Sequence, residues 1–172
     1  DNEKLDAIII EYQNHEGYNY EDYPLGNFSE EYFKSEKEFA DSLLLKLDDI
    51  DITKLDENDN ISYELLSFVL NDIIAYYDFE RFLNPLLSDS GFHSSLVYNV
   101  RPMYNYEQVK NYLNKLNAIP QYVDQYLPLL RIGLEKGVSQ PLVIFKGYES
   151  TYNDHITKDF ESNYFYSPFN KL

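Results

Sequence analysis

Apolar residues recur at helical intervals along most of the chain, beginning near its amino terminus. Leu5, Ile8, Ile9 and Tyr12 fall on one face of a helix, and this pattern stops near Gly17. The spacing predicts an amphipathic first helix. Residues 17–27 mix turn-forming residues with aromatic side chains, which indicates an ordered loop.

A second helix is predicted to begin at Asn27, because Asn27 and Glu30 have the spacing of a capping box. Its predicted buried face consists of Tyr32, Phe39, Leu43, Leu47 and Ile50. A third helix follows the polar turn 56–60, whose last residues are expected to cap it. The apolar face predicted for the third helix carries Ile61, Leu65, Phe68, Val69, Ile73 and Tyr76.

The helical pattern ends at Asn84, because the following Pro85 disfavours a helical residue before it. Residues 84–104 are the least periodic stretch and are expected to form a long connection that can include one short extended piece. Asn105 and Gln108 then repeat the capping-box spacing. The helix that they open has an apolar face formed by Val109, Tyr112, Leu113 and Leu116.

A further helix is predicted to start at Pro120, to be kinked by Pro128 and to end at a left-handed cap on Gly137. Its predicted buried face is Val123, Leu127, Leu130 and Leu134. Ser139 is expected to cap a last helix over about residues 140–155. The patterns together predict an all-α fold: about six amphipathic helices in an irregular bundle, without a substantial sheet, as a single helical region over 1–172.

Charge and composition narrow the classes of function. The chain has 30 acidic and 14 basic residues and a formal net charge of −16, which disfavours nucleic acids and anionic membrane surfaces as partners. It has no cysteine and no apolar run long enough for a transmembrane segment. Its 18 tyrosines favour half-buried interfaces and grooves, although a biased codon usage explains them equally well.

The histidines do not form a zinc-peptidase motif. His15 and Glu16 begin like one, but the second histidine of the motif is replaced by Asn19. His93 and His155 have no second histidine nearby, so all three are interpreted as surface or capping residues.

The acidic residues are interpreted as structural. Asp56, Asn58 and Asn60 resemble the start of a calcium loop, but Ile61 and Ser67 stand where such a loop needs Gly and Glu. Adjacent carboxylates do not face each other on a helix, so two acidic pairs are expected to be solvated: Glu30 with Glu31, and Asp48 with Asp49.

The three arginines are expected to pair with carboxylates or helix ends, although one of them could hold a ligand carboxylate. They are Arg81, Arg101 and Arg131. No catalytic, cofactor-binding or metal-binding residue is assigned.

One long, ordered series of residues resembles a known family. It comprises Tyr106, Glu107, Tyr112, Leu113, Leu116, the stretches 118–125 and 130–133, Gly137, Gln140, Pro141 and 167–169. The series is similar to the bacterial family called domain of unknown function 885, and the resemblance covers most of the chain in outline. The chain departs from the family pattern at Lys115, where the family has Arg, and at Asn105, where it has Asp. Lysine cannot form the bidentate pair that arginine forms, which puts a salt bridge there in doubt.

The resemblance implies a long, all-helical protein that is commonly exported and often lipid-anchored. It also implies a gluzincin-type zinc metallopeptidase, with an HExxH-type motif in a carboxy-terminal half to which this chain has no counterpart. Export to the periplasm or lipid anchoring after leader removal is therefore expected, and a cytoplasmic location stays open. Zinc is expected only in the full-length parent.

Two hypotheses follow. In the first, the chain is the amino-terminal helical region of a secreted zinc peptidase, where it packs on the catalytic half and forms one wall of the substrate cleft. It would then expose an apolar patch through which it could dimerise when isolated. In the second, the chain is a non-catalytic helical module that binds peptides or a partner protein.

Overall fold

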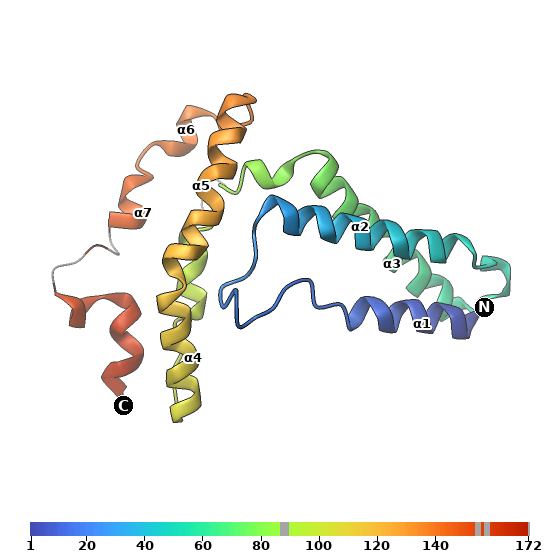
Figure 1. Ribbon diagram of the computed structural model, residues 1–172, viewed down its shortest axis with the longest axis horizontal. Coiled ribbons are helices and arrows are strands. Elements are labelled where there is room, and N and C mark those ends of the chain that lie inside the picture. Colours follow the sequence, from blue (N-terminus) through green and yellow to red (C-terminus); the bar gives the residue numbers. More distant parts are fainter. Residues whose placement is uncertain (87–89, 154–155, 157–158, 172) are drawn as a thin grey trace. The chain divides into compact units, whose positions relative to one another are not determined.

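The chain forms an all-α structure, as predicted. The structure is a computed structural model, and it describes residues 1–86, 90–153, 156 and 159–171 (Figure 1). These residues contain no strand, and one isolated antiparallel bridge joins Leu86 to Gly91. The chain divides into two compact units. Unit 1 comprises Asp1–Asn19 and Phe28–Phe82, and unit 2 comprises Tyr20–Asn27 and Leu83–Leu172.

Unit 1 is built from three helices, in which α2 runs antiparallel to α1 and α3 (Figure 1). Their bounds are Asn2–Gln13 for α1, Glu30–Asp48 for α2 and Glu57–Asp78 for α3. Two short 3-10 helices follow α2 and α3, namely η1 at Ile52–Lys54 and η2 at Arg81–Leu83. A short connection that contains η1 therefore joins α2 to α3, whereas the longer stretch 14–29 lies between α1 and α2.

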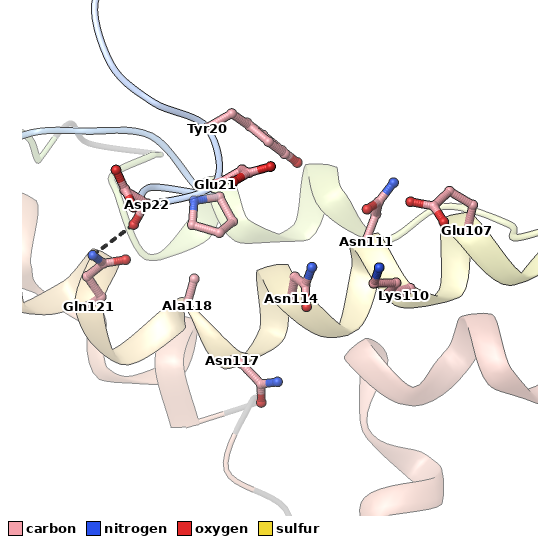
Figure 2. Close-up of a pocket in the computed structure, with 11 residues that line it drawn as sticks. Tyr20, Glu21, Asp22, Glu107, Lys110, Asn111, Asn114, Asn117, Ala118 and Gln121 are labelled. Carbon is pink, nitrogen blue, oxygen red and sulfur yellow. Dashed lines mark hydrogen bonds between the residues drawn. The ribbon is translucent and has the colours of Figure 1, made fainter.

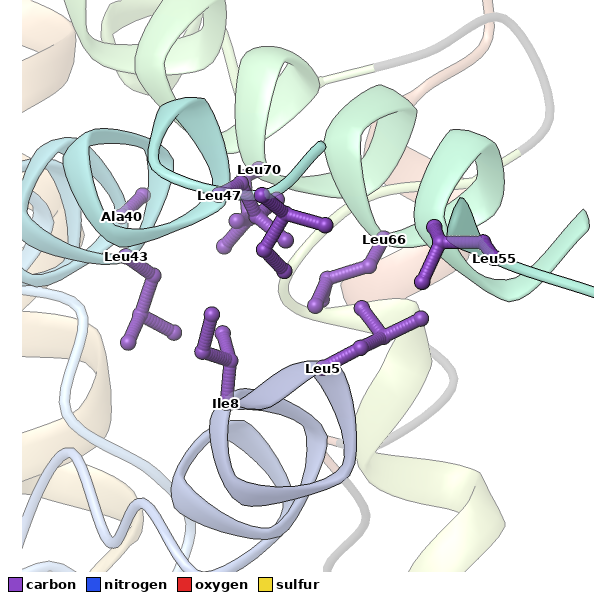
Figure 3. Close-up of a cluster of buried hydrophobic side chains, with 9 residues drawn as sticks. Leu5, Ile8, Ala40, Leu43, Leu47, Leu55, Leu66 and Leu70 are labelled. Atoms are coloured by element: carbon purple, nitrogen blue, oxygen red, sulfur yellow. The ribbon is translucent and has the colours of Figure 1, made fainter. Parts of the chain in front are cut away.

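The core of unit 1 is aliphatic. Figure 3 shows Leu5 and Ile8 of α1 pointing between α2 and α3, toward Leu43 and Leu66. The complete cluster is Leu5, Ile8, Ala40, Leu43, Leu47, Ile50, Leu55, Leu66 and Leu70. Full burial of one such leucine contributes about 1.5–3 kcal/mol, so these side chains dominate the stability of the unit.

The first two predicted faces are confirmed where they enter this cluster. Leu5 and Ile8 are buried, and Leu43, Leu47 and Ile50 are buried on or just after α2. The start of α2 was predicted wrongly. Its cap is Ser29, whose Oγ accepts a hydrogen bond from the Tyr32 amide at 3.2 Å. Asn27 therefore lies before the cap.

The face predicted for α3 is wrong over its first part, although Ile73 does pack against the core. Leu66 and Leu70 are buried, whereas Ile61, Leu65 and Phe68 are 60%, 62% and 71% exposed. The helix carries apolar residues on both faces, so spacing alone could not choose between them. The polar turn before α3 does cap it, but through its first residue: Asp56 accepts from the Asp59 amide at 3.0 Å.

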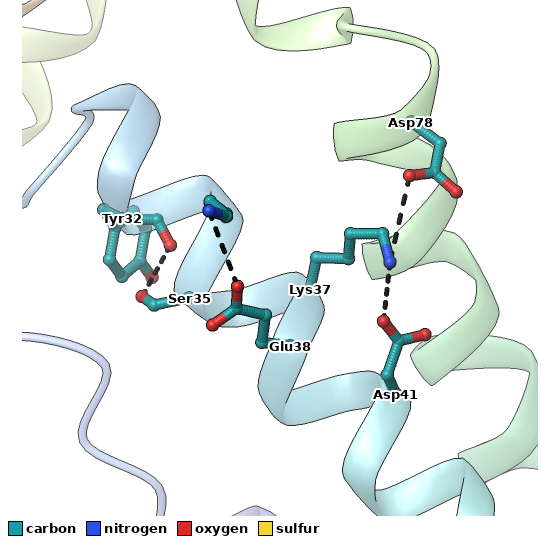
Figure 4. A network of polar contacts seen from close by, with 7 residues as sticks. Tyr32, Ser35, Lys37, Glu38, Asp41 and Asp78 are labelled. Atoms are coloured by element: carbon teal, nitrogen blue, oxygen red, sulfur yellow. Dashed lines mark hydrogen bonds and ion pairs between the residues drawn. The ribbon is translucent and has the colours of Figure 1, made fainter.

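A lysine links the middle of α2 to the end of α3. Lys37 Nζ lies 2.6 Å from an Asp41 carboxylate oxygen and 4.0 Å from one of Asp78 (Figure 4). The hydrogen bond that Lys37 donates to the Asp41 carboxylate raises the pKa of Lys37. Because both carboxylates are largely exposed, these ion pairs are expected to contribute little to stability.

Unit 2 combines two longer helices with several short ones. The longer helices are α4 at Tyr106–Asn117 and α5 at Ile119–Glu135, and only Ala118 separates them (Figure 1). The short helices are η3 at Ser94–Asn99, α6 at Leu142–Phe145, α7 at Glu149–Asn153, η4 at Phe160–Ser162 and η5 at Tyr164–Lys171. Six residues of the long connection predicted at 84–104 thus form the 3-10 helix η3.

The predicted start of α4 and the predicted end of α5 are confirmed, whereas α5 begins at Ile119, one residue before Pro120. Asn105 caps α4 by accepting from the Gln108 amide at 2.9 Å. Gly137 has a φ of +74° after α5, and the Val138 amide donates to the Gly133 carbonyl at 2.7 Å. This bond, with that from Gly137 to the carbonyl of Leu134, forms a Schellman cap. The helix continues through Pro128.

The buried face of α5 is displaced by one residue from the predicted one. Tyr122, Tyr126, Leu129 and Gly133 are buried, whereas Leu134 is 71% exposed. The prediction was wrong because the aliphatic residues of this helix recur at the same helical spacing as the buried residues, one position later. A buried tyrosine is tolerated here because its hydroxyl finds a hydrogen-bond partner.

The predicted last helix is interrupted. Gly147, with a φ of +82°, separates α6 from α7, and Pro141 occupies the cap position of α6 in place of Ser139. His155 lies outside the described residues. Among the described residues, no helix is both long enough and apolar enough to cross a bilayer.

Candidate functional site

The two described histidines belong to different units and each has local partners. His15 Nε2 lies 2.7 Å from a Glu36 carboxylate oxygen, and its ring stacks on Phe39 at 3.7 Å. His93 Nε2 lies 2.7 Å from the Thr151 hydroxyl. The His93 ring also packs against that of Tyr148, at 4.9 Å between centroids. Both side chains therefore make packing contacts as well as polar ones, whereas the sequence predicted surface or capping residues.

No metal site is found in the part of the chain that the structure describes. No group of three or more His, Asp or Glu side chains there is arranged to hold an ion. The calcium-like stretch works as a helix cap through Asp56. The acidic pairs are exposed, as expected: Glu30 with Glu31, and Asp48 with Asp49.

Two of the three arginines have the structural role that was predicted. Arg81 forms an ion pair with Asp72 at 3.1 Å, and Arg101 donates to the Tyr98 carbonyl at 3.2 Å near the end of η3. Arg131 is exposed on α5. Where the family pattern has arginine, Lys115 donates to the side-chain oxygen of Asn99 at 3.0 Å, which is a neutral acceptor.

A polar groove in unit 2 is the candidate site. It lies between the loop 20–24 and the α4–α5 segment, and its volume is about 600 Å³ (Figure 2). The loop contributes Tyr20, Glu21, Asp22 and Pro24. The helices contribute Glu107, Lys110, Asn111, Asn114, Asn117, Ala118 and Gln121.

Two glutamines of α5 hold the loop in place. Gln121 Nε2 donates to the Asp22 carbonyl at 3.1 Å, and Gln125 Nε2 donates to the Gly26 carbonyl at 3.2 Å. A loop carbonyl that is bonded to a helix side chain cannot move without losing that bond. The far wall of the groove is therefore fixed to α5 at two points.

A row of carboxamides follows α4 along the near wall. Asn111, Asn114 and Asn117 are three residues apart, and all three are exposed. Their side chains make no hydrogen bond to another described protein group. Because helical residues rise about 1.5 Å each, neighbouring amides in the row are displaced by roughly 4.5 Å along the helix. Each amide offers two donors and one acceptor oxygen to a ligand.

The charged groups of the groove are mostly acidic. Glu21, Asp22 and Glu107 contribute carboxylates, and Lys110 contributes the one cation among the lining residues. All four side chains are exposed. The groove thus suits a neutral or basic ligand that has many hydrogen-bonding groups.

Sequence reasoning missed this site. The loop was predicted as ordered, but nothing in the hydrophobic pattern placed it against a helix about a hundred residues later. The hydrogen bond from Gln121 to Asp22 joins residues that are 99 positions apart. One signal was available. The spacing of Asn111, Asn114 and Asn117 is visible in the sequence and is unusual for an amphipathic helix, in which asparagine is a poor former.

Comparison with known proteins gives a family but no relative of established function. The chain matches no curated protein and no solved structure at a significant level. Residues 11–172 match the sequence pattern of one family, described as a bacterial protein of unknown function (DUF885). This confirms the resemblance seen in the residue order between Tyr106 and the SPF stretch at 167–169. The match covers nearly the whole chain, and the protein belongs to the DUF885 family.

Proposed function

We propose that unit 2 holds an extended peptide segment in its amide-lined groove and contributes one wall of a substrate cleft. The observation that carries this proposal is the row of exposed, unbonded amides formed by Asn111, Asn114 and Asn117. A peptide backbone presents one donor and one acceptor per residue, and a carboxamide complements both at once.

The spacing of the row supports a peptide over a compact ligand. An extended chain advances by about 3.3 Å per residue, so the row of three amides, which spans roughly 9 Å along the helix, is as long as about three residues of such a chain. The carboxylates of Glu21 and Glu107 would favour a peptide that carries a basic side chain or a free amino terminus.

In this proposal the chemistry of peptide cleavage belongs to a carboxy-terminal half of the same protein. That half would supply the zinc ion of a gluzincin-type peptidase, and an exported or lipid-anchored location would follow from the same resemblance. The role of the present chain would be to bind and orient. If the chain instead acts as a free-standing module, the groove would bind peptides in the same way without cleavage.

The experiment is a titration of the 172-residue chain against a dye-labelled eight-residue peptide of alternating Ala and Ser with one central Lys, followed by fluorescence anisotropy. Asn114→Ala should weaken binding by about 2–12-fold, because one hydrogen bond contributes about 0.5–1.5 kcal/mol. Alanine is the better helix former, so the substitution should not unfold α4.

Asn58→Ala is the matched control, since Asn58 is an exposed amide on α3 in the other unit. It should leave the affinity unchanged. Failure of the unmodified chain to bind the peptide, or equal weakening by the two substitutions, would show the proposal to be wrong. In a full-length peptidase, Asn114→Ala should raise KM and leave kcat unchanged, because the lost contact is made equally in the ground and transition states.

A further inference from the structure

We propose that unit 1 carries a second site, a shallow aromatic pocket that binds an organic cation such as a substituted ammonium group. The pocket has a volume of about 240 Å³ and lies between α2 and α3. It is lined by Tyr32, Phe33, Glu36, Asp72, Ile73 and Tyr76. It is independent of the peptide groove, since no residue lines both.

The aromatic wall of this pocket is continuous. The Phe33 ring lies 5.6 Å from that of Tyr32 and 5.3 Å from that of Tyr76, measured between centroids. Phe82 stacks on Phe33 at 5.2 Å. Aromatic faces carry partial negative charge and attract cations within about 6 Å. Rings held by one another in this way form a surface that needs little reordering when a ligand binds.

Two carboxylates give the pocket its charge. Glu36 lies on α2 and Asp72 on α3, and both line the pocket. The Glu36 carboxylate is only 19% exposed and is held by His15. Burial, followed by the nearby charge of Glu36, raises the pKa of Tyr32 to about 12, so this phenol stays neutral at physiological pH. The pocket therefore combines ring faces with negative charge, which is the combination that binds ammonium groups.

The chain itself already places a cation against two of the lining residues. The Arg81 guanidinium lies 5.2 Å from the centroid of the Tyr76 ring and forms an ion pair with Asp72 at 3.1 Å. Both charged side chains are more than half exposed, at 53% for Arg81 and 62% for Asp72. An external cation would thus share Asp72 and Tyr76 with Arg81. Removal of Arg81 should strengthen binding, which a merely structural role for this residue does not predict.

The test uses choline chloride and its neutral isostere, 3,3-dimethylbutan-1-ol, at constant ionic strength. The 172-residue chain is titrated with each, and the ring proton shifts of Tyr32, Phe33 and Tyr76 are followed by NMR. Choline should give saturable shifts in the millimolar range, and the alcohol should bind at least about threefold more weakly, since it lacks the cation–π attraction.

Three variants test whether choline binding depends on the charges beside the pocket or on the net charge of the chain. Arg81→Gln should tighten choline binding by about threefold, and Asp72→Asn should weaken it by a similar factor. Lys46→Gln is the matched control, because Lys46 is an exposed cation of the same unit that pairs with Glu11. It should leave the affinity unchanged.

Three results would overturn the proposal. They are equal binding of choline and the alcohol, absence of saturable shifts in both the unmodified chain and Arg81→Gln, and equal effects of Arg81→Gln and Lys46→Gln. All three variants change exposed side chains, so the chain should remain folded and the comparison interpretable.

Discussion

Unit 1 encloses aliphatic side chains between three helices, whereas unit 2 buries tyrosines and binds them to backbone carbonyls. The buried cluster of unit 1 contains only leucine, isoleucine and alanine. In unit 2, the Tyr112 hydroxyl donates to the Phe165 carbonyl and the Tyr122 hydroxyl to the Phe92 carbonyl, both at 2.8 Å. Unit 2 thus joins segments that have little regular structure of their own through side-chain-to-backbone bonds.

The difference shows which kind of interaction fixes the packing of the segments in each unit. Aliphatic burial is non-directional, so the helices of unit 1 are specified mainly by shape and volume. A hydroxyl-to-carbonyl bond is directional and fixes one short segment against one helix. This is how α4 holds η5 through Tyr112 and how α5 holds the loop 20–27 through Gln121 and Gln125.

The largest expected effect is in the aliphatic core. Leu70→Ala should destabilise unit 1 by about 2–5 kcal/mol, because Leu70 is fully buried and its truncation leaves a cavity. Chemical denaturation followed by circular dichroism measures the change. Leu65→Ala is the control on the same helix and should cost less than about 0.5 kcal/mol, since Leu65 is 62% exposed. Equal losses of stability from the two substitutions would mean that α3 packs on the core with a different face.

A close backbone approach in unit 2 should give the next effect. A Cβ added at Gly133 would lie 2.5 Å from the Leu83 carbonyl oxygen, so α5 or the segment at Leu83 must shift. Gly133→Ala should therefore destabilise unit 2 by about 1–3 kcal/mol. Gly137→Asn provides the comparison, because a Cβ there meets open space and asparagine tolerates a positive φ. A neutral Gly133→Ala would contradict this packing.

Each hydrogen bond donated by a buried tyrosine should contribute less to the free energy of unfolding. Tyr112→Phe removes the bond to the Phe165 carbonyl but keeps the ring, and should cost about 1 kcal/mol. Tyr106→Phe is the control at the start of the same helix, where the side chain is 82% exposed, and should be neutral. Hydrogen exchange of the amides in η5 should also quicken in Tyr112→Phe. Unchanged exchange would mean that Tyr112 does not hold η5.

The smallest effect should appear only at alkaline pH. Burial raises the pKa of both Tyr32 and Tyr112 to about 12, one residue in each unit. An unfolded tyrosine ionises near pH 10, so the folded state favours the neutral phenol. The resulting stability is complete below about pH 10 and is lost as the pH rises toward 12. Tyrosinate absorbance should show late-titrating residues, and Tyr112→Phe should remove one of them.

The same contrast explains what the sequence could predict. The aliphatic face of α1 and the glycine cap at Gly137 follow from local spacing and backbone preference, and both are confirmed. The faces of α3 and α5 were wrong for different reasons. In α3, Leu65 and Leu66 are neighbours of equal hydrophobicity, and only the position of α1 and α2 decides which is buried. In α5, the buried face includes Tyr122 and Tyr126, whereas the predicted face consisted of aliphatic residues.

Neither candidate site could be predicted from the spacing of hydrophobic residues. The groove depends on bonds between α5 and a loop far away in the sequence, and the pocket depends on Phe33 and Tyr76 meeting across two helices. Both arise from tertiary contacts of aromatic and amide side chains. The hydrophobic pattern placed Tyr32 and Tyr76 on the apolar faces of their helices, but it could not show that these residues line one pocket.

The most direct test of the groove as a peptide site is to observe its amides. Side-chain NH₂ signals of Asn111, Asn114 and Gln121, assigned through single substitutions, should shift on addition of the Ala-Ser-Lys peptide, together with the backbone amides of residues 20–22. The signals of unit 1, such as the Asn58 side chain, should not move. Shifts spread evenly over both units, or none in the groove at saturating peptide, would contradict the account.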